Sequence, residues 1–204
     1  MLPNVSINPR ALSALSLIND LRRAAFEALE RKHKYPALLL FYSFIDICAS
    51  LAQENQTAGN RERFESFLSR YALTTWSQYK PYDLWAARSS LLHAYSPLGY
   101  HTEKPNGATP IFYFVWPETK EEMTEILASR GYTNFLVLDI QTIKHIGVSA
   151  FNSMWLRVES DSVFESTFLA NSEHLLKDVH QRLLENELVL LDEVSQLRGE
   201  PSGG

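Results

Sequence analysis

Apolar residues at helical spacing run through residues 1–95 of this 204-residue chain, and they constrain its fold more than any other feature. Asn8-Pro9 is typical of an N-cap followed by proline at the first helical position, so a helix is predicted from there to about Lys32. Three more helices are predicted, from Pro36 to about Gln53, from Asn60 to about Tyr71, and from about Pro81 to Tyr95. Four helices joined by short or moderate loops predict a helical bundle.

The pattern changes after Pro97, where β-forming residues appear. Segments 108–116 (ATPIFYFVW) and 133–140 (TNFLVLDI) are predicted strands, because they are rich in aromatic and β-branched residues. Between them, a capping box at residues 119–122 predicts a helix that stops at Gly131. Two further helices are predicted, from about Gln141 to Glu159 and from Asn171 to about Glu187.

Together these segments predict a mainly α protein with a small strand–helix–strand elaboration. Residues 1–97 are expected to form the bundle. Residues 98–204 are expected to form an α/β insertion and C-terminal helices that pack on the same domain. No internal repeat and no long low-complexity linker separates the two parts.

Composition and charge limit the classes of function. The net charge of −5 gives no overall positive field, so any nucleic-acid contact must come from a local patch. The single cysteine, Cys48, excludes an internal disulfide and fits a reducing compartment. The most hydrophobic stretch, residues 37–51, contains polar residues and is shorter than a membrane span. No signal peptide and no clustered metal-ligand set is evident, so we expect a soluble cytoplasmic protein without a membrane partner, cofactor or metal.

The fourth predicted helix carries the strongest functional signal. Its core face bears Arg88 on its edge, whereas His93 lies among the small residues of a second face. Arg88 and His93 are about 140° apart around the helix and about 7.5 Å apart along it, so one straight helix cannot aim both at one atom. Two copies related by a two-fold axis can do so if each offers its small-residue face, at Ala86, Ser89 and Ser90, to the other. We therefore expect a homodimer.

Residues 88–95 (RSSLLHAY) fit the pattern R-x-x-x-x-H-x-Y, with Arg88, His93 and Tyr95 at its fixed positions. This pattern resembles the signature of the HEPN superfamily, helical proteins many of which are metal-independent ribonucleases. The resemblance implies a dimeric bundle in which Arg88 and His93 of both subunits line a cleft. It also implies a toxin or defence effector, with a cognate antitoxin or a nucleotidyltransferase as partner. Ser89 departs from the family, because many active members carry Asn, Asp or His there.

The chemistry that the resemblance implies is the cleavage of RNA by its own 2′-hydroxyl. His93 would act as general acid and base, because histidine titrates near neutral pH. Arg88 would bind the phosphate and stabilise the charge of the transition state. Ser89, Asp46, Asp83 and Tyr95 would support these two residues. Independently of the resemblance, the aromatic side chains of Tyr82 and Trp85 are candidates to stack on bases.

Each of these residues also has a structural interpretation. Arg88 fits a helix-edge arginine paired with Asp46 or Asp83, and His93 fits a charge that favours the C-terminal end of a helix. Asp46 fits a solvated stripe, and Tyr82 and Trp85 fit anchors of a protein interface. Tyr95 fits a core residue, although the resemblance makes it a candidate for nucleotide addition. The alternative to an enzyme is a non-catalytic dimeric module that binds a nucleotide, an RNA or a protein through the same cleft.

Overall fold

The computed structural model describes residues 9–72, 76–94, 98, 101–102, 107–115 and 117–177, without the side chains of 9–12, 93 and 94. The four helices predicted first are present, with small shifts at their ends: α1 (Pro9–Glu30), α2 (Lys34–Leu51), α3 (Asn60–Tyr71) and α4 (Pro81–Ala94). A fifth long helix, α6 (Ile140–Ser160), also lies where the sequence predicted it. The prediction of a mainly helical protein is confirmed.

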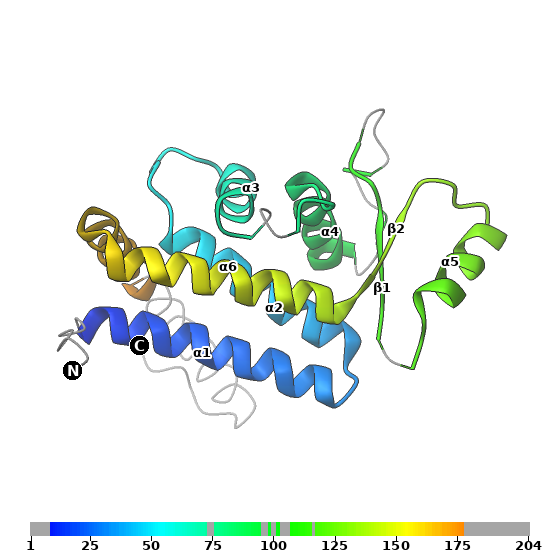
Figure 1. The fold of residues 1–204 in the computed structure, drawn as a ribbon, viewed down its shortest axis with the longest axis horizontal. Helices are drawn as coiled ribbons and strands as arrows, with labels where there is room; N and C mark the ends of the chain where they lie inside the picture. Colours follow the sequence, from blue (N-terminus) through cyan, green and yellow to red (C-terminus); the bar gives the residue numbers. More distant parts are fainter. Residues whose placement is uncertain are drawn as a thin grey trace, which may run out of the picture.

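The long helices α1, α2 and α6 run side by side, and α3 and α4 lie across them on one side, seen nearly end-on in Figure 1. α2 is the central element, because it contacts α1, α3, α4 and α6. Within the described residues, α2 is also the one helix long and apolar enough to cross a membrane, but half of it is buried by the protein. This is the character of a core helix in a soluble protein; a cytoplasmic location stays a prediction.

The predicted strand–helix–strand unit is present at one end of the bundle (Figure 1). β1 (Ile111–Phe114) and β2 (Leu136–Asp139) pair in parallel, with Ile111 opposite Leu136. Parallel strands need a crossover, which α5 (Lys120–Ser129) supplies. The predicted capping box at Thr119 and Glu122 forms in both directions and opens α5. The chain reverses after α5 at Gly131, whose φ of 86° is a conformation that favours glycine.

Two polar contacts fix this unit to the bundle close to α4. The hydroxyl groups of Tyr42 on α2 and Tyr113 on β1 are hydrogen-bonded to each other in the core. The carboxylate of Asp83, in the first turn of α4, accepts a hydrogen bond of 2.9 Å from the backbone N–H of Thr109. The segment before β1 is therefore held against α4.

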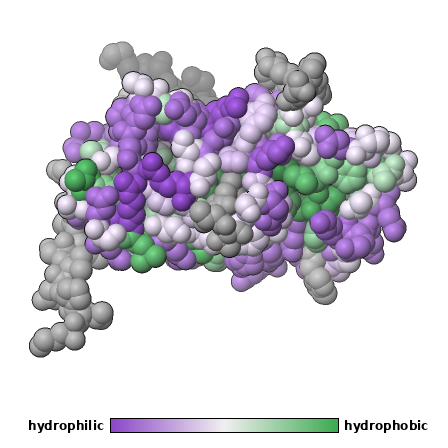
Figure 2. All heavy atoms as spheres, turned by 45° about the horizontal axis from the view of Figure 1, so that its top comes forward, coloured by the Kyte–Doolittle hydropathy of each residue, from purple (hydrophilic) through white to green (hydrophobic). Residues whose placement is uncertain are grey.

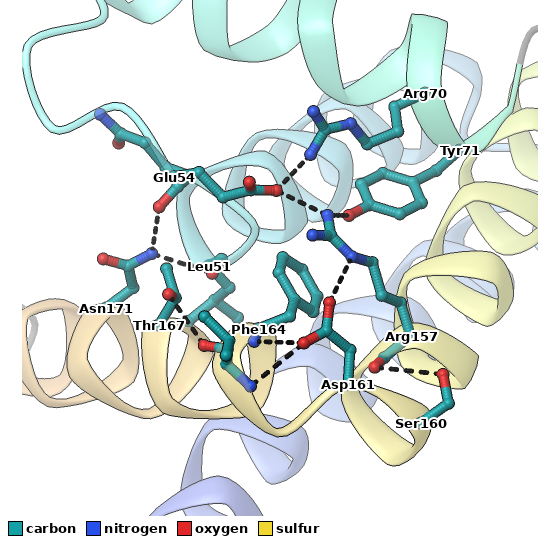
Figure 3. Close-up of polar contacts among 12 residues, drawn as sticks. Leu51, Glu54, Arg70, Tyr71, Arg157, Ser160, Asp161, Phe164, Thr167 and Asn171 are labelled. Carbon is teal, nitrogen blue, oxygen red and sulfur yellow. Dashed lines mark hydrogen bonds and ion pairs between the residues drawn. The ribbon is translucent and has the colours of Figure 1, made fainter.

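The predicted start of the last helix at Asn171 is wrong. A helix already runs over residues 162–177, and Asp161 caps it by accepting hydrogen bonds of 3.1 Å from the backbone N–H groups of Val163 and Phe164. Asn171 lies inside this helix, and its Nδ2 donates to the carbonyl oxygens of Leu51 at 3.0 Å and Gln53 at 2.8 Å (Figure 3). The asparagine that looked like an N-cap therefore satisfies the C-terminal end of α2. The predicted remainder of the helix, residues 178–187, lies outside the described residues.

Candidate functional site

The candidate site is centred on an ion pair between Arg88 on α4 and Asp46 on α2. The Nε of Arg88 donates to Oδ2 of Asp46 at 2.7 Å, and its Nη2 lies 2.6 Å from the same oxygen. Both side chains are partly exposed, Arg88 to 22% and Asp46 to 28%. The sequence offered two carboxylates for Arg88, and the structure selects Asp46, because Asp83 is turned toward the backbone of Thr109.

Two opposing effects act on the pKa of Asp46. Burial raises the pKa of Asp46 above its usual value, and the guanidinium groups of Arg88 and Arg63 act in the opposite direction. The two cations therefore offset part of the cost of burying this carboxylate. In turn it orients Arg88, while one carboxylate oxygen cannot occupy all five N–H donors of a guanidinium.

A second arginine, Arg63 on α3, completes the site. Asp46, Arg63 and Arg88 line a small pocket of about 90 Å³ together with Ala49, Ser50 and Asn60. Arg63 is held by Oε1 of Gln53 at 3.0 Å and by Oδ1 of Asn60. Because two guanidinium groups and one carboxylate meet there, the local charge is positive although the chain is acidic overall. Such an arrangement suits a phosphate group.

Sequence reasoning missed Arg63, although α3 was predicted with its correct ends. The run NRER at residues 60–63 offered a cluster of arginines at the start of a helix, where the helix dipole also favours an anion. Which of these arginines points toward Asp46 depends on how the loop between α2 and α3 turns back. A single sequence does not specify that path.

Of the remaining residues of the predicted motif, the structure describes some and not others. His93 lies in the last turn of α4, but its side chain is outside the described part of the structure, as is all of Tyr95. Ser89 is half-buried, next to Arg88 in the chain. The convergence of Arg88 and His93 across a two-fold axis therefore stays a prediction.

The small-residue face of α4 was expected to contact a second copy of the chain. Two of its three residues are instead buried within the chain. Ala86 and Ser90 are buried within the chain itself, on the same stripe of α4 as buried Asp83. Asp83 on this stripe is bound to the backbone of Thr109, so the segment before β1 lies against this side of α4. A second copy of the chain would have to approach α4 from the side of Ser89, which is half-buried.

The two aromatic residues predicted to stack on bases lie on α4, six and three residues before Arg88. Tyr82 and Trp85 are both half-buried, and their rings contact Arg61 of α3 and His101. Figure 2 turns this side of the molecule, with α3 and α4, toward the reader. Hydrophilic residues cover most of the visible face, and hydrophobic ones gather toward the end that carries the strands.

A second polar cluster, shown in Figure 3, joins α3, α6 and the segment after α2. The Nη1 of Arg157 donates to Oε1 of Glu54 at 2.5 Å and to the hydroxyl of Tyr71 at 3.0 Å. Glu54 also pairs with Arg70, and the Nε of Arg157 donates to Asp161 at 3.3 Å. The polar groups in this cluster satisfy one another, so we assign it to holding the end of α6 against α3. Sequence reasoning assigned none of these residues.

This cluster predicts a pH-dependent stability. The hydrogen bond from Arg157 lowers the pKa of Glu54 most, with Arg70 acting in the same direction. A carboxylate with a lowered pKa stabilises the folded state above its unfolded pKa, and this contribution is lost as the pH falls through the folded value. Glu54→Gln should therefore be less stable than the wild type at pH 7, by no more than about 1 kcal/mol because the pair is solvent-screened.

The difference should shrink as the pH falls below 4.5, the ordinary pKa of glutamate. Urea unfolding at neutral and acidic pH measures it. The matched control is Glu27→Gln at an exposed position of α1, which should show no such trend. A Glu54→Gln deficit that is equal at both pH values would contradict the role given to this carboxylate.

Within the described ranges, no group of three or more His, Cys, Asp or Glu side chains gathers that could hold a metal ion. Comparison of the chain with protein-family models, with curated protein sequences and with solved structures found no match.

Proposed function

We propose that this protein is a HEPN-like, metal-independent endoribonuclease, in which Arg88 holds the scissile phosphate and His93 transfers protons. The observation that carries the proposal is the pairing of Arg88 with Asp46 at a small pocket that a second guanidinium, of Arg63, also lines. Guanidinium groups match phosphate oxygens in shape and stay charged as negative charge develops in the transition state. The R-x-x-x-x-H-x-Y sequence pattern, whose Arg88 and His93 lie on α4, supports the same assignment.

The proposed reaction needs no external nucleophile. The 2′-oxygen of the RNA loses its proton to an imidazole and forms a bond to phosphorus, and the bond from phosphorus to the 5′-oxygen breaks. An imidazolium then protonates the departing 5′-oxygen. The products are a 2′,3′-cyclic phosphate and a 5′-hydroxyl. Because Arg88 and His93 diverge on one helix, we propose that two copies of α4 share each cleft, so that a homodimer is the active form.

Incubation of the purified protein with a synthetic RNA tests this function. We expect cleavage between about pH 6 and pH 8, the range in which histidine titrates. The products should carry cyclic phosphate ends, and a chelator should leave the rate unchanged. An RNA with a single 2′-deoxy position should resist cleavage there, because the nucleophile is missing. RNA that is bound but left intact under all these conditions would favour the alternative, a non-catalytic RNA-binding module.

A further inference from the structure

We infer that Tyr82, Trp85 and Arg61 form a stacking site for an unpaired base of single-stranded RNA, next to the phosphate pocket at Arg88. This inference rests on the proposed function, because it names the form of RNA that the same surface would bind. The three side chains come from α3 and α4, the two helices that also supply Arg63 and Arg88.

The geometry of the cluster is that of a stacking platform. The rings of Tyr82 and Trp85 lie on successive turns of α4 and are nearly parallel, with an interplanar angle of 14° and 6.4 Å between their centroids. The guanidinium carbon of Arg61 lies 4.3 Å from the centroid of Tyr82 and 5.8 Å from that of Trp85. His101 packs at an angle against Trp85, with 4.5 Å between centroids. The cluster thus holds two rings in a fixed orientation beside a cation.

The cluster is partly exposed to solvent, and Trp85 also packs against the edge of the hydrophobic core. Neighbouring positions of α4, such as Leu84 and Ala87, are buried, whereas Tyr82 and Trp85 are half-buried. The side chain of Arg61 is 54% exposed and also pairs with Glu65 one turn further along α3. Aromatic rings and arginine planes at a surface are the groups on which proteins stack unpaired bases.

The position of the cluster connects it to the phosphate pocket. Trp85 precedes Arg88 by three residues, which is about 4.5 Å along the helix axis. Arg61 and Arg63 lie two residues apart on α3 and point to nearly opposite sides of it, so α4 is the element that joins the cluster to the pocket. A nucleotide whose phosphate lies between Arg63 and Arg88 can therefore place a base on Tyr82 and Trp85. Bases of a duplex are already stacked and paired, so this platform selects a single strand.

Fluorescence anisotropy of a labelled, 2′-O-methyl single-stranded RNA tests the inference without cleavage. Because stacking contributes about 1–3 kcal/mol per base, Trp85→Ala and Tyr82→Ala should each weaken binding roughly 5- to 150-fold. Trp85→Phe, which keeps a ring, should lose much less. The matched control is Tyr35→Ala, at an aromatic residue that is 50% exposed at the start of α2, and it should bind like the wild type. Thermal unfolding of each variant verifies that it is folded.

The outcomes separate the inference from the proposed function. If the wild type binds the single strand and Arg88→Ala weakens binding while folded Trp85→Ala does not, the stacking site is wrong and the proposed function stands. If a duplex of the same sequence binds as tightly as the single strand, the stacking site is also wrong. If Trp85→Ala changes the oligomeric state but not RNA binding, the rings are interface anchors instead. If the wild type binds no RNA at all, the proposed function itself fails.

Discussion

Replacing Arg88 by alanine should lower the rate of RNA cleavage roughly 10²- to 10³-fold, the effect typical of removing one donor that stabilises transition-state charge. The loss has two sources. The guanidinium that would meet the phosphate disappears, and Asp46 is left half-buried without the cation that its Oδ2 contacts at 2.6 and 2.7 Å. Only Arg63 then remains to offset the cost of burying Asp46, so the pocket itself is weakened. Single-turnover cleavage of one RNA substrate measures this effect separately from binding.

Two variants make the Arg88 experiment specific. Arg88→Lys keeps the charge but loses the planar fork, so it should recover little of the lost rate. Arg23→Ala removes an arginine that pairs with Asp20 on the exposed side of α1, and it should cleave like the wild type. Chemical unfolding of Arg88→Ala verifies that the fold survives. Cleavage by folded Arg88→Ala at the wild-type rate would show that Arg88 does not bind the scissile phosphate.

The second large effect concerns the buried contact between Tyr42 and Tyr113. Tyr42→Phe should reduce the free energy of unfolding by about 1–3 kcal/mol, because it leaves the hydroxyl of Tyr113 buried without its partner. Tyr113→Phe should have a similar effect for the same reason. The double variant should be close to the wild type in stability, since both polar groups are then removed together. Urea unfolding of all four proteins provides the double-mutant cycle.

This cycle also tests how the strand unit is attached to the bundle. The hydroxyl pair lies between β1 and α2, one helical turn before Asp46, so it supports the helix that carries the site. Burial raises the pKa of both tyrosines, so both remain protonated and the contact should not titrate near neutral pH. A double variant whose loss equals the sum of the two single losses would show that the hydroxyl groups are not each other's partners.

Most of the fold could be predicted because its signals are local. The apolar spacing of α1 to α4, the capping box at Thr119 and the glycine at 131 each specify structure within a few residues. The start of the last helix was mispredicted because Asn171 has the residue type of an N-cap but serves a contact with the end of α2, over 100 residues earlier. The true cap, Asp161, follows α6 directly. The start of the helix over residues 162–177 was therefore interpreted as a loop after α6.

The candidate site was predictable in part. The motif on α4 and the polar stripe on α2 singled out Arg88 and Asp46, and their contact is present. Arg61 and Arg63 were missed because their roles depend on the packing of α3 against α4 and on the path of the preceding loop. Ser90 was expected on a face open to a second copy, but it is buried within the chain, which its local sequence does not show. In each case the missing information is tertiary.

At the junction between β2 and α6, the strand leads into the helix without a loop, because β2 ends at Asp139 and α6 begins at Ile140. Asp139 is both the last residue of the strand and the cap of the helix, accepting from the backbone N–H of Gln141 at 3.0 Å. No linker lies between the two elements, so a change in the register of β2 would be passed directly to α6. A slip of β2 by one residue would rotate α6 by about 100°, and Ile143, Ile146 and Ala150 would leave the core. The register of four strand pairs thus fixes which face of a 21-residue helix is buried. Strands paired in another register would prevent α6 from packing in the bundle.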